Sequence, residues 1–184
     1  MQAKNLQKQK GFTLVEIAIV LVIIGLLLGG VLKGQELITN SKIKSVTQDF
    51  DGIQAAYYSY QDRIGKVPGD SDGDGQIDNE QAFWNELRSQ GFIKGASGST
   101  HPTHALDGNF YVDFSTTTAF NKNEVCATNI DGAVALGMDV KMDDAAGAAN
   151  AAAALAAGKT GILRSSGLAD WPATGTTATV CKEL

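Results

Sequence analysis

An apolar run near the N-terminus constrains this chain more than any other feature. It extends from Phe12 to Leu32, 21 residues of which only Glu16 is charged. As a helix it would be roughly 32 Å long at ~1.5 Å per residue, which matches the ~30 Å hydrocarbon core of a bilayer. The run therefore predicts a membrane-crossing helix, and Glu16 is the residue in it that needs an explanation.

The residues before the run indicate its orientation. Lys4, Lys8 and Lys10 precede it with no acidic residue among them, which predicts a single-pass protein with a cytoplasmic N-terminus. A secretory signal has the same basic start, but its apolar region is usually ~7–15 residues long and a small-residue cleavage site follows it. Here the run is longer and no such site follows, so we expect the run to be retained.

The helix is expected to continue beyond Leu32 with a different character. Seven apolar residues recur at spacings of three and four: Ile43, Val46, Phe50, Ile53, Tyr57, Tyr60 and Ile64. This pattern predicts an amphipathic helix that ends near Gly65, since Pro68 disfavours helix at the residue before it. The stripe either packs on the chain's own globular part or forms a coiled coil. Because the seam lasts only three heptads, we favour the first.

The remaining residues predict a small head of mixed structure. A short helix is expected over Gln81–Ser89, with Asn79 or Asp78 as its N-cap. Alternating apolar residues predict strands at Phe110–Phe114 and Leu136–Met142, and a last strand at Ile162–Arg164. The Ala-rich stretch Ala145–Ala157 predicts a weak helix or a surface insertion. The fold class is α+β: a long N-terminal helix packed on a small antiparallel sheet with extended loops.

Charge and cysteine usage narrow the function further. Beyond residue 11 there are 12 basic and 20 acidic residues, a formal charge of −8, so nucleic acid is a poor partner. Cys126 and Cys181 lie on the side of the membrane predicted to be outside. A pair of cysteines in an oxidising compartment is most simply a disulfide; two unrelated buried thiols are the alternative.

An acidic loop at residues 70–80 predicts a cation site. It begins D-x-D-x-D-G-x-I-D, the first nine positions of an EF-hand loop. The place of the bidentate glutamate is taken by Gln81, with Glu80 one residue earlier, and no helix leads into the loop. The calcium ligands predicted on this basis are Asp70, Asp72, Asp74, Gln76, Asp78 and Glu80. The alternative is a solvated acidic turn, and no other cofactor is expected.

The start of the apolar run also resembles a known signal. The stretch from Lys10 to Gly25, KGFTLVEIAIVLVIIG, is similar to the class III signal of type IV pilins and type II secretion pseudopilins. It has a short basic leader, a Gly-Phe junction, a glutamate five residues after the cut, and then a long apolar helix. Many type IV pilins carry a proline where this chain has Lys33-Gly34, so major pilin, minor pilin and pseudopilin all remain open.

The resemblance implies how the chain is divided and processed. A membrane prepilin peptidase would cut between Gly11 and Phe12 and N-methylate Phe12. The parts are then a leader (1–11), a membrane and filament-core half-helix (12–32), an amphipathic half-helix (33–65), and a head (66–184) with the acidic loop and a disulfide-closed C-terminal region. The cut creates a cationic amine, and Glu16 of a neighbouring subunit is its expected partner in a filament.

The resemblance therefore implies a structural, pilin-like subunit rather than an enzyme. The implied partners are other copies, the peptidase, and an assembly platform with its ATPase. The subunit would start in the bacterial inner membrane and end in a periplasmic or extracellular filament. The alternative is a membrane-anchored, calcium-dependent binding domain that never polymerises. Glu16 discriminates between the two, since a mere anchor needs no acid there.

Other motifs in the chain carry little weight. Ala153–Thr160 fits a relaxed phosphate-loop pattern ending in Gly-Lys-Thr, but no strand is predicted before it. His101 and His104 are too few ligands for a zinc site. Asp143-Asp144 suits the start of the Ala-rich helix. We find no nucleophile and base pattern that would indicate catalysis.

Overall fold

The computed structural model describes residues 11, 13–96, 98, 101–115, 121–142, 162–165, 171–172 and 175–184. The elements within them are α1 (Leu14–Ile64), α2 (Glu80–Ser89), β1 (Phe110–Ser115), β2 (Lys122–Asp131), α3 (Gly132–Met142), β3 (Leu163–Ser165) and β4 (Thr177–Glu183). This is the α+β class that the sequence predicts. The chain divides into two compact units, Met1–Asn40 and Ser41–Leu184, and each is described by itself.

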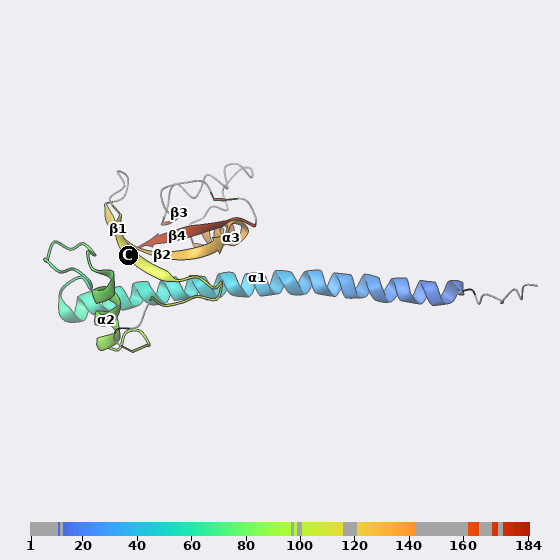
Figure 1. Ribbon diagram of the computed structural model, residues 1–184, viewed down its shortest axis with the longest axis horizontal. Helices are drawn as coiled ribbons and strands as arrows, with labels where there is room; N and C mark the ends of the chain where they lie inside the picture. The colour runs from blue at the N-terminus through green and yellow to red at the C-terminus, as the bar shows by residue number, and fades with distance from the viewer. Residues whose placement is uncertain are drawn as a thin grey trace, which may run out of the picture. The chain divides into compact units, whose positions relative to one another are not determined.

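The first unit contains the N-terminal part of α1 (Figure 1). Its apolar side chains are exposed: Leu14 is 91% exposed, Leu26 73% and Leu32 68%. Among the described residues α1 is the one helix long and apolar enough to cross a membrane, with a mean hydropathy of 2.8 over 18 residues, none of them buried. An apolar surface of this extent requires lipid or protein around it.

The second unit begins with the amphipathic part of α1. Five residues of the predicted stripe are buried: Val46, Phe50, Ile53, Tyr57 and Tyr60. The stripe therefore packs into the chain's own core, as expected, and does not form a coiled-coil seam. The helix ends at the predicted place, because Gly65 adopts φ +80°, a conformation that favours glycine, and donates its N–H to the carbonyl of Gln61 at 2.8 Å.

A four-stranded antiparallel sheet packs against this part of α1 (Figure 1). The strand order is β1-β2-β4-β3, so β2 and β4 are central. Phe50 of α1 meets Phe110 of β1 edge to face, with ring centroids 5.1 Å apart. The amide of Gln54 donates to the carbonyl of Glu183 on β4 at 3.1 Å. Helix and sheet thus share one core.

The short helix α2 begins where the sequence predicts. The side-chain oxygen of Asn79 accepts a hydrogen bond from the N–H of Ala82 at 3.0 Å, so Asn79 rather than Asp78 is the N-cap. Phe83, Trp84 and Leu87 are buried on one face. The helix therefore closes the core beside the acidic loop.

The strand predicted over Leu136–Met142 is wrong, because these residues belong to helix α3. Apolar residues alternate in the sequence of this segment, but the buried positions follow the period of a helix: Val134, Ala135, Met138 and Asp139. The side chain of Asp131 accepts from the N–H of Ala133 at 2.9 Å at the start of the helix. Alanine, leucine and methionine have high helix propensity, so propensity and packing agree.

Two strands lie where the sequence shows no usable pattern. Strand β2 has five consecutive buried residues from Asn123 to Ala127, so the alternation that marks a half-exposed strand is absent. Strand β4 lies in the Thr-rich C-terminal segment, which is expected only to be held by Cys181. The predicted last strand at Ile162–Arg164 is observed as β3, one residue later, and is followed by β4.

Candidate processing and assembly site

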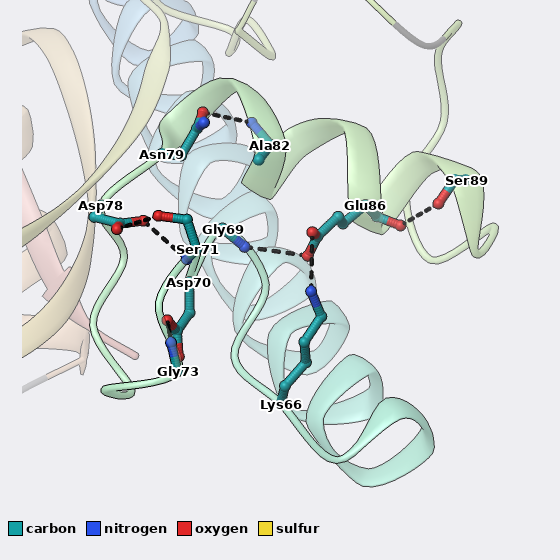
Figure 2. Close-up of polar contacts among 10 residues, drawn as sticks. All are labelled: Lys66, Gly69, Asp70, Ser71, Gly73, Asp78, Asn79, Ala82, Glu86 and Ser89. Carbon is teal, nitrogen blue, oxygen red and sulfur yellow. Dashed lines mark hydrogen bonds and ion pairs between the residues drawn. The ribbon is translucent and has the colours of Figure 1, made fainter.

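The acidic loop is organised around the carboxylate of Asp70 (Figure 2). Its two oxygens accept hydrogen bonds from the N–H groups of Gly73, at 2.6 Å, and Gly75, at 2.9 Å. These bonds, Gly73 first, lower the pKa of Asp70. Both glycines have φ near +86°, which explains why this sharp turn needs glycine. The loop thus holds one carboxylate ionised and fixed.

Three of the predicted ligands come together in this loop. Asp70, Asp72 and Asp74 each place a carboxylate oxygen within 4.8 Å of the other two, an arrangement that can hold a metal ion. The side chain of Asp74 accepts from the N–H of Gln76 at 2.8 Å and from its amide nitrogen at 2.6 Å. The short turn is therefore stabilised by local bonds that need no cation.

Of the three remaining predicted ligands, Gln76 donates to Asp74, and Asp78 and Glu80 are engaged elsewhere. Asp78 accepts from the N–H of Ser71 at 3.1 Å and from its hydroxyl, which ties the two ends of the loop together (Figure 2). The Oε1 atom of Glu80 accepts from the N–H of Val112 at 3.2 Å and from the indole of Trp84 at 3.4 Å. Glu80 thus connects α2 to β1 rather than completing the cluster.

A residue outside the loop, Asn123 on β2, anchors it to the core. Its side-chain oxygen accepts from the N–H of Ile77 at 2.9 Å, and its amide donates to the carbonyl of Gly75 at 2.8 Å. The amide also donates to the hydroxyl of Tyr57 on α1 at 3.1 Å. Asn123 is only 9% exposed. No local pattern predicts this role, since its partners lie 46 or more positions away.

The start of the loop is attached to α2. Glu86 accepts from the backbone N–H of Gly69 at 3.2 Å and from the ammonium of Lys66 at 3.3 Å (Figure 2). The carbonyl of Gly69 accepts from the N–H of Asn79 at 3.0 Å. A Cβ at Gly69 would lie 2.9 Å from the Cβ of Phe83, so the chain approaches α2 closely enough to require glycine.

The two cysteines form the predicted disulfide. Cys126 and Cys181 face each other on β2 and β4, with Cα atoms 4.0 Å apart and a sequence separation of 55. Both are buried. The alternative of two unrelated thiols is therefore wrong, and the C-terminal strand is covalently attached to the centre of the sheet. Glu124 is close enough to form a metal cluster with them, but sulfurs joined to each other do not offer thiolates.

The two histidines lie in different environments. His104 is buried; its Nε2 lies 2.9 Å from the carbonyl of Thr128, and its Nδ1 accepts from the N–H of Leu106 at 3.2 Å. Burial lowers the pKa of His104. His101 is more exposed, 3.6 Å from Glu80. Within the described part of the chain, no potential metal cluster contains a histidine.

At the other end of the chain, α1 begins with a reciprocal cap. The N–H and the hydroxyl of Thr13 both donate to the Glu16 carboxylate at 2.8 Å, and the N–H of Glu16 donates back to the Thr13 hydroxyl at 3.3 Å. This is a capping box, T-x-x-E, whose acid also favours the positive end of the helix. The cap by Thr13 is not among the sequence predictions, although the T-x-x-E spacing is present in the sequence. Glu16 therefore has a local partner in the uncut chain.

The comparison with known proteins concerns the same segment. Residues 6–32 match the family described as the prokaryotic N-terminal methylation motif. This segment is a class III prepilin signal. It is the signal of type IV pilins and pseudopilins, and it includes Thr13 and Glu16. No curated protein and no solved structure matches the chain.

Of the two residues at the predicted cleavage site, the structure describes Gly11 but not Phe12. Gly11 is exposed, with open space where a Cβ would lie. Phe12 and residues 1–10 lie outside the described residues, as do Asp143-Asp144, Ala145–Ala157 and Ala153–Thr160. The chain thus combines a prepilin signal with a long N-terminal helix, a small antiparallel sheet and a disulfide in its head.

Proposed function

We propose that this chain is a structural subunit that polymerises into a type IV pilus or a related filament after cleavage between Gly11 and Phe12. The observation that carries the proposal is the combination, in one segment, of the prepilin signal with an exposed apolar helix that has Glu16 near its start. The capping box gives this carboxylate a local role, but an anchor helix can be capped without a charge in its apolar run, where a charge costs free energy in a membrane.

The chemistry at the junction explains the carboxylate. Hydrolysis of the Gly11–Phe12 peptide bond produces a cationic amine on Phe12, which the same peptidase then methylates. Phe12 precedes Glu16 by four positions in the sequence, which is about one helical turn in a helix. In a filament, the amine of an incoming subunit pairs with Glu16 of a neighbour already in place. Because a buried charge without a partner is costly, this pair selects the axial register.

The capping box adds a step to this scheme. In the uncut chain Thr13 supplies two donors to Glu16, so the carboxylate is satisfied before a neighbour arrives. Pairing with the neighbour's amine then exchanges neutral donors for a charged one, and charge-assisted hydrogen bonds are roughly twice as strong as neutral ones. The exchange favours assembly over the isolated subunit.

The proposed partners follow from the membrane location of the helix and from its processing. The apolar half of α1 resides in the inner membrane, with Lys4, Lys8 and Lys10 on the cytoplasmic side. There the prepilin peptidase acts, and a platform protein with its ATPase extracts the subunit. The apolar helices then form the filament core, and the heads face outward.

The decisive experiment is mass spectrometry of sheared surface filaments from cells that express the chain. N-methyl-Phe12 at the start of the recovered protein is the expected result. Glu16→Val is expected to be cleaved normally yet to give at least about tenfold less filament protein, with Val22→Glu as the matched control for charge placement. Filaments that retain the Met1–Lys10 leader, or a normal yield from Glu16→Val, would contradict the proposal.

The alternative function, a calcium-dependent binding domain that does not polymerise, is favoured by one observation. It is the convergence of the Asp70, Asp72 and Asp74 carboxylates. Titration of the full chain in detergent with calcium tests it: calcium heat and a raised melting temperature are expected, and both should be lost in Asp72→Asn/Asp74→Asn. No heat and no shift in the wild type would end the calcium prediction.

A further inference from the structure

The charged residues of the second unit are distributed unevenly along α1. Lys42 and Lys44 lie on its first turns within that unit, and both are exposed. The loop that carries Asp72 and Asp74 follows its last turn, and both of these are exposed as well. Among the described residues, none of the four takes part in an ion pair.

The lysine end also includes Lys141. Helix α3 packs on α1 there, since a Cβ on Gly137 would lie 2.9 Å from the Cδ1 of Ile43. Lys141 is exposed and lines the same surface hollow as Thr47, with a volume of about 440 Å³. Among the described residues of α1, the next two acids after Lys44 in sequence are Asp49 and Asp51.

The net charge at this end of α1 depends on the state of those two acids. Asp51 is paired with Lys182 on β4 at 2.7 Å, and Asp49 is half-buried, which raises its pKa. Among the described residues, the three exposed lysines outnumber Asp49, so this surface carries a net positive charge; we call it the basic end (Lys42, Lys44 and Lys141).

The opposite end of α1 is acidic. Asp62 is exposed on its last turns, and the loop contributes four aspartates: Asp70, Asp72, Asp74 and Asp78. The nearby cations are engaged: Lys66 with Glu86 at 3.3 Å, and Arg63 over the ring of Phe92 at 6.0 Å. We call this region the acidic end (Asp62 and the four loop aspartates, of which Asp70 is buried).

The two ends are too far apart to meet within one subunit. The loop lies beside Gln61, with which Asp70, Gly73 and Gly75 line a hollow of about 510 Å³. From Ile43 to Gln61 the helix advances 18 residues, roughly 27 Å at ~1.5 Å per residue. Opposite charges at that distance are largely screened at physiological salt.

A second copy displaced along the helix axis can bring the ends together. We propose that the basic end of one head binds the acidic end of the next copy in the filament, with Lys42 and Lys44 against Asp72 and Asp74. Such a head-to-tail contact is heterologous, the type that builds helical filaments. Like ends repel, so the contact also disfavours the reverse orientation. The inference rests on the proposed polymerisation.

Anionic lipid headgroups are the competing partner for the basic end. The charge pattern favours a second copy, because the complementary acidic surface lies on the same chain and is displaced from the lysines along the axis of α1. A lipid surface would give the acidic end no role. The experiment below therefore changes both ends.

Zero-length carbodiimide cross-linking of wild-type filaments tests the contact directly, because the reagent joins only amines and carboxylates that touch. The filaments are washed in chelator, since a divalent ion would lower the loop charge from −4 to −2. The expected product is a peptide linking Lys42 or Lys44 to Asp72 or Asp74 in the dimer band of a denaturing gel. Lys66–Glu86, paired within one subunit, is the positive control in the monomer band.

Charge exchange provides the second arm. Lys42→Glu/Lys44→Glu is expected to reduce filament yield about tenfold, because two attractions become repulsions. Adding Asp72→Lys/Asp74→Lys should restore the yield to within about twofold. Lys94→Glu, the same change at an exposed lysine that is not part of the basic end, should leave the yield within about twofold of the wild type.

The possible results distinguish the proposed head-to-tail contact from the proposed polymerisation. Filaments that contain N-methyl-Phe12 but give the control cross-link alone would overturn the contact and leave polymerisation intact. A yield lost in the lysine variant and not recovered by the exchange would overturn it as well and indicate a lipid surface. A wild type that never forms filaments would overturn both.

Discussion

The two parts of α1 use the same kinds of residue for opposite purposes. Leu28, in the first unit, is 61% exposed, whereas Phe50, in the second, is completely buried. None of the described residues of the first unit, 11 and 13–40, covers this apolar surface, so its stability in water depends on lipid or on other protein. The second unit covers its own stripe with a sheet and two short helices. One continuous helix thus has one half whose partners lie outside the chain and one half whose partners lie within it.

This difference explains why only the N-terminal segment of the chain matches a known family. The prepilin signal ends at residue 32, and its features act over one or two helical turns: the junction, the T-x-x-E cap and the apolar run. The head depends on contacts between distant residues, and many sequences can satisfy such contacts. Neither a curated protein nor a solved structure matches it.

Matched truncations in the two halves should show the largest difference. Phe50→Ala is expected to lower the free energy of unfolding of the head by about 4 kcal/mol, because it leaves a cavity in a closed core. Leu28→Ala should change it by less than about 0.5 kcal/mol. Denaturant unfolding of the full chain in detergent, followed by tryptophan fluorescence, measures both. Equal losses of unfolding free energy in the two variants would contradict the proposed difference between the two halves of α1.

Loss of the loop anchor should have an intermediate effect. Asn123→Ala removes the partners of Ile77 and Gly75 and should cost about 2 kcal/mol, since buried polar groups are left unsatisfied. Hydrogen exchange at the Ile77 N–H should accelerate at the same time. Asn121→Ala, at an exposed neighbour, is the control. Unchanged exchange at Ile77 would mean that Asn123 does not hold the loop.

The helix cap in the first unit should contribute less. Thr13→Val removes the hydroxyl that joins Glu16 to the first turn and should destabilise that turn by about 1 kcal/mol. Amide exchange at Glu16 in micelles should rise about fivefold. Thr39→Val in mid-helix should leave it unchanged, as should every head mutation. Identical exchange in Thr13→Val and the wild type would contradict the capping box.

The smallest effect is a pH dependence of the head. Burial lowers the pKa of His104 in the folded state, so the unfolded state binds the proton more readily. Stability is therefore fully present above the unfolded pKa of ~6.5 and declines as the pH falls through it. His104→Gln, which keeps a donor for Thr128, should flatten the profile of unfolding free energy between pH 7 and 5, whereas His101→Gln should not. A His104→Gln profile as steep as the wild type would assign the dependence to another group.

Much of the chain was predictable because its signals are local. The apolar run, the stripe from Val46 to Tyr60, the end of α1 at Gly65 and the Asn79 cap all depend on residues within about four positions of each other. The pairing of Cys126 with Cys181 needed only their number and compartment. The convergence of Asp70, Asp72 and Asp74 followed from alternate spacing around glycine, although calcium itself stays a prediction.

What the sequence could not determine depends on contacts between distant positions. Strand β2 lies between β1 and β4 and is buried on both faces, so it lacks the alternation that marks a strand. The sequence of helix α3 has the apolar alternation of a strand, and its helix propensity together with packing against Ile43 sets its conformation. Asn123 can be recognised as the anchor of the loop only once β2 lies beside Gly75 and Tyr57. Helical periods and caps are set by neighbouring residues, whereas sheet pairing and buried polar contacts join residues that only the folded chain brings together.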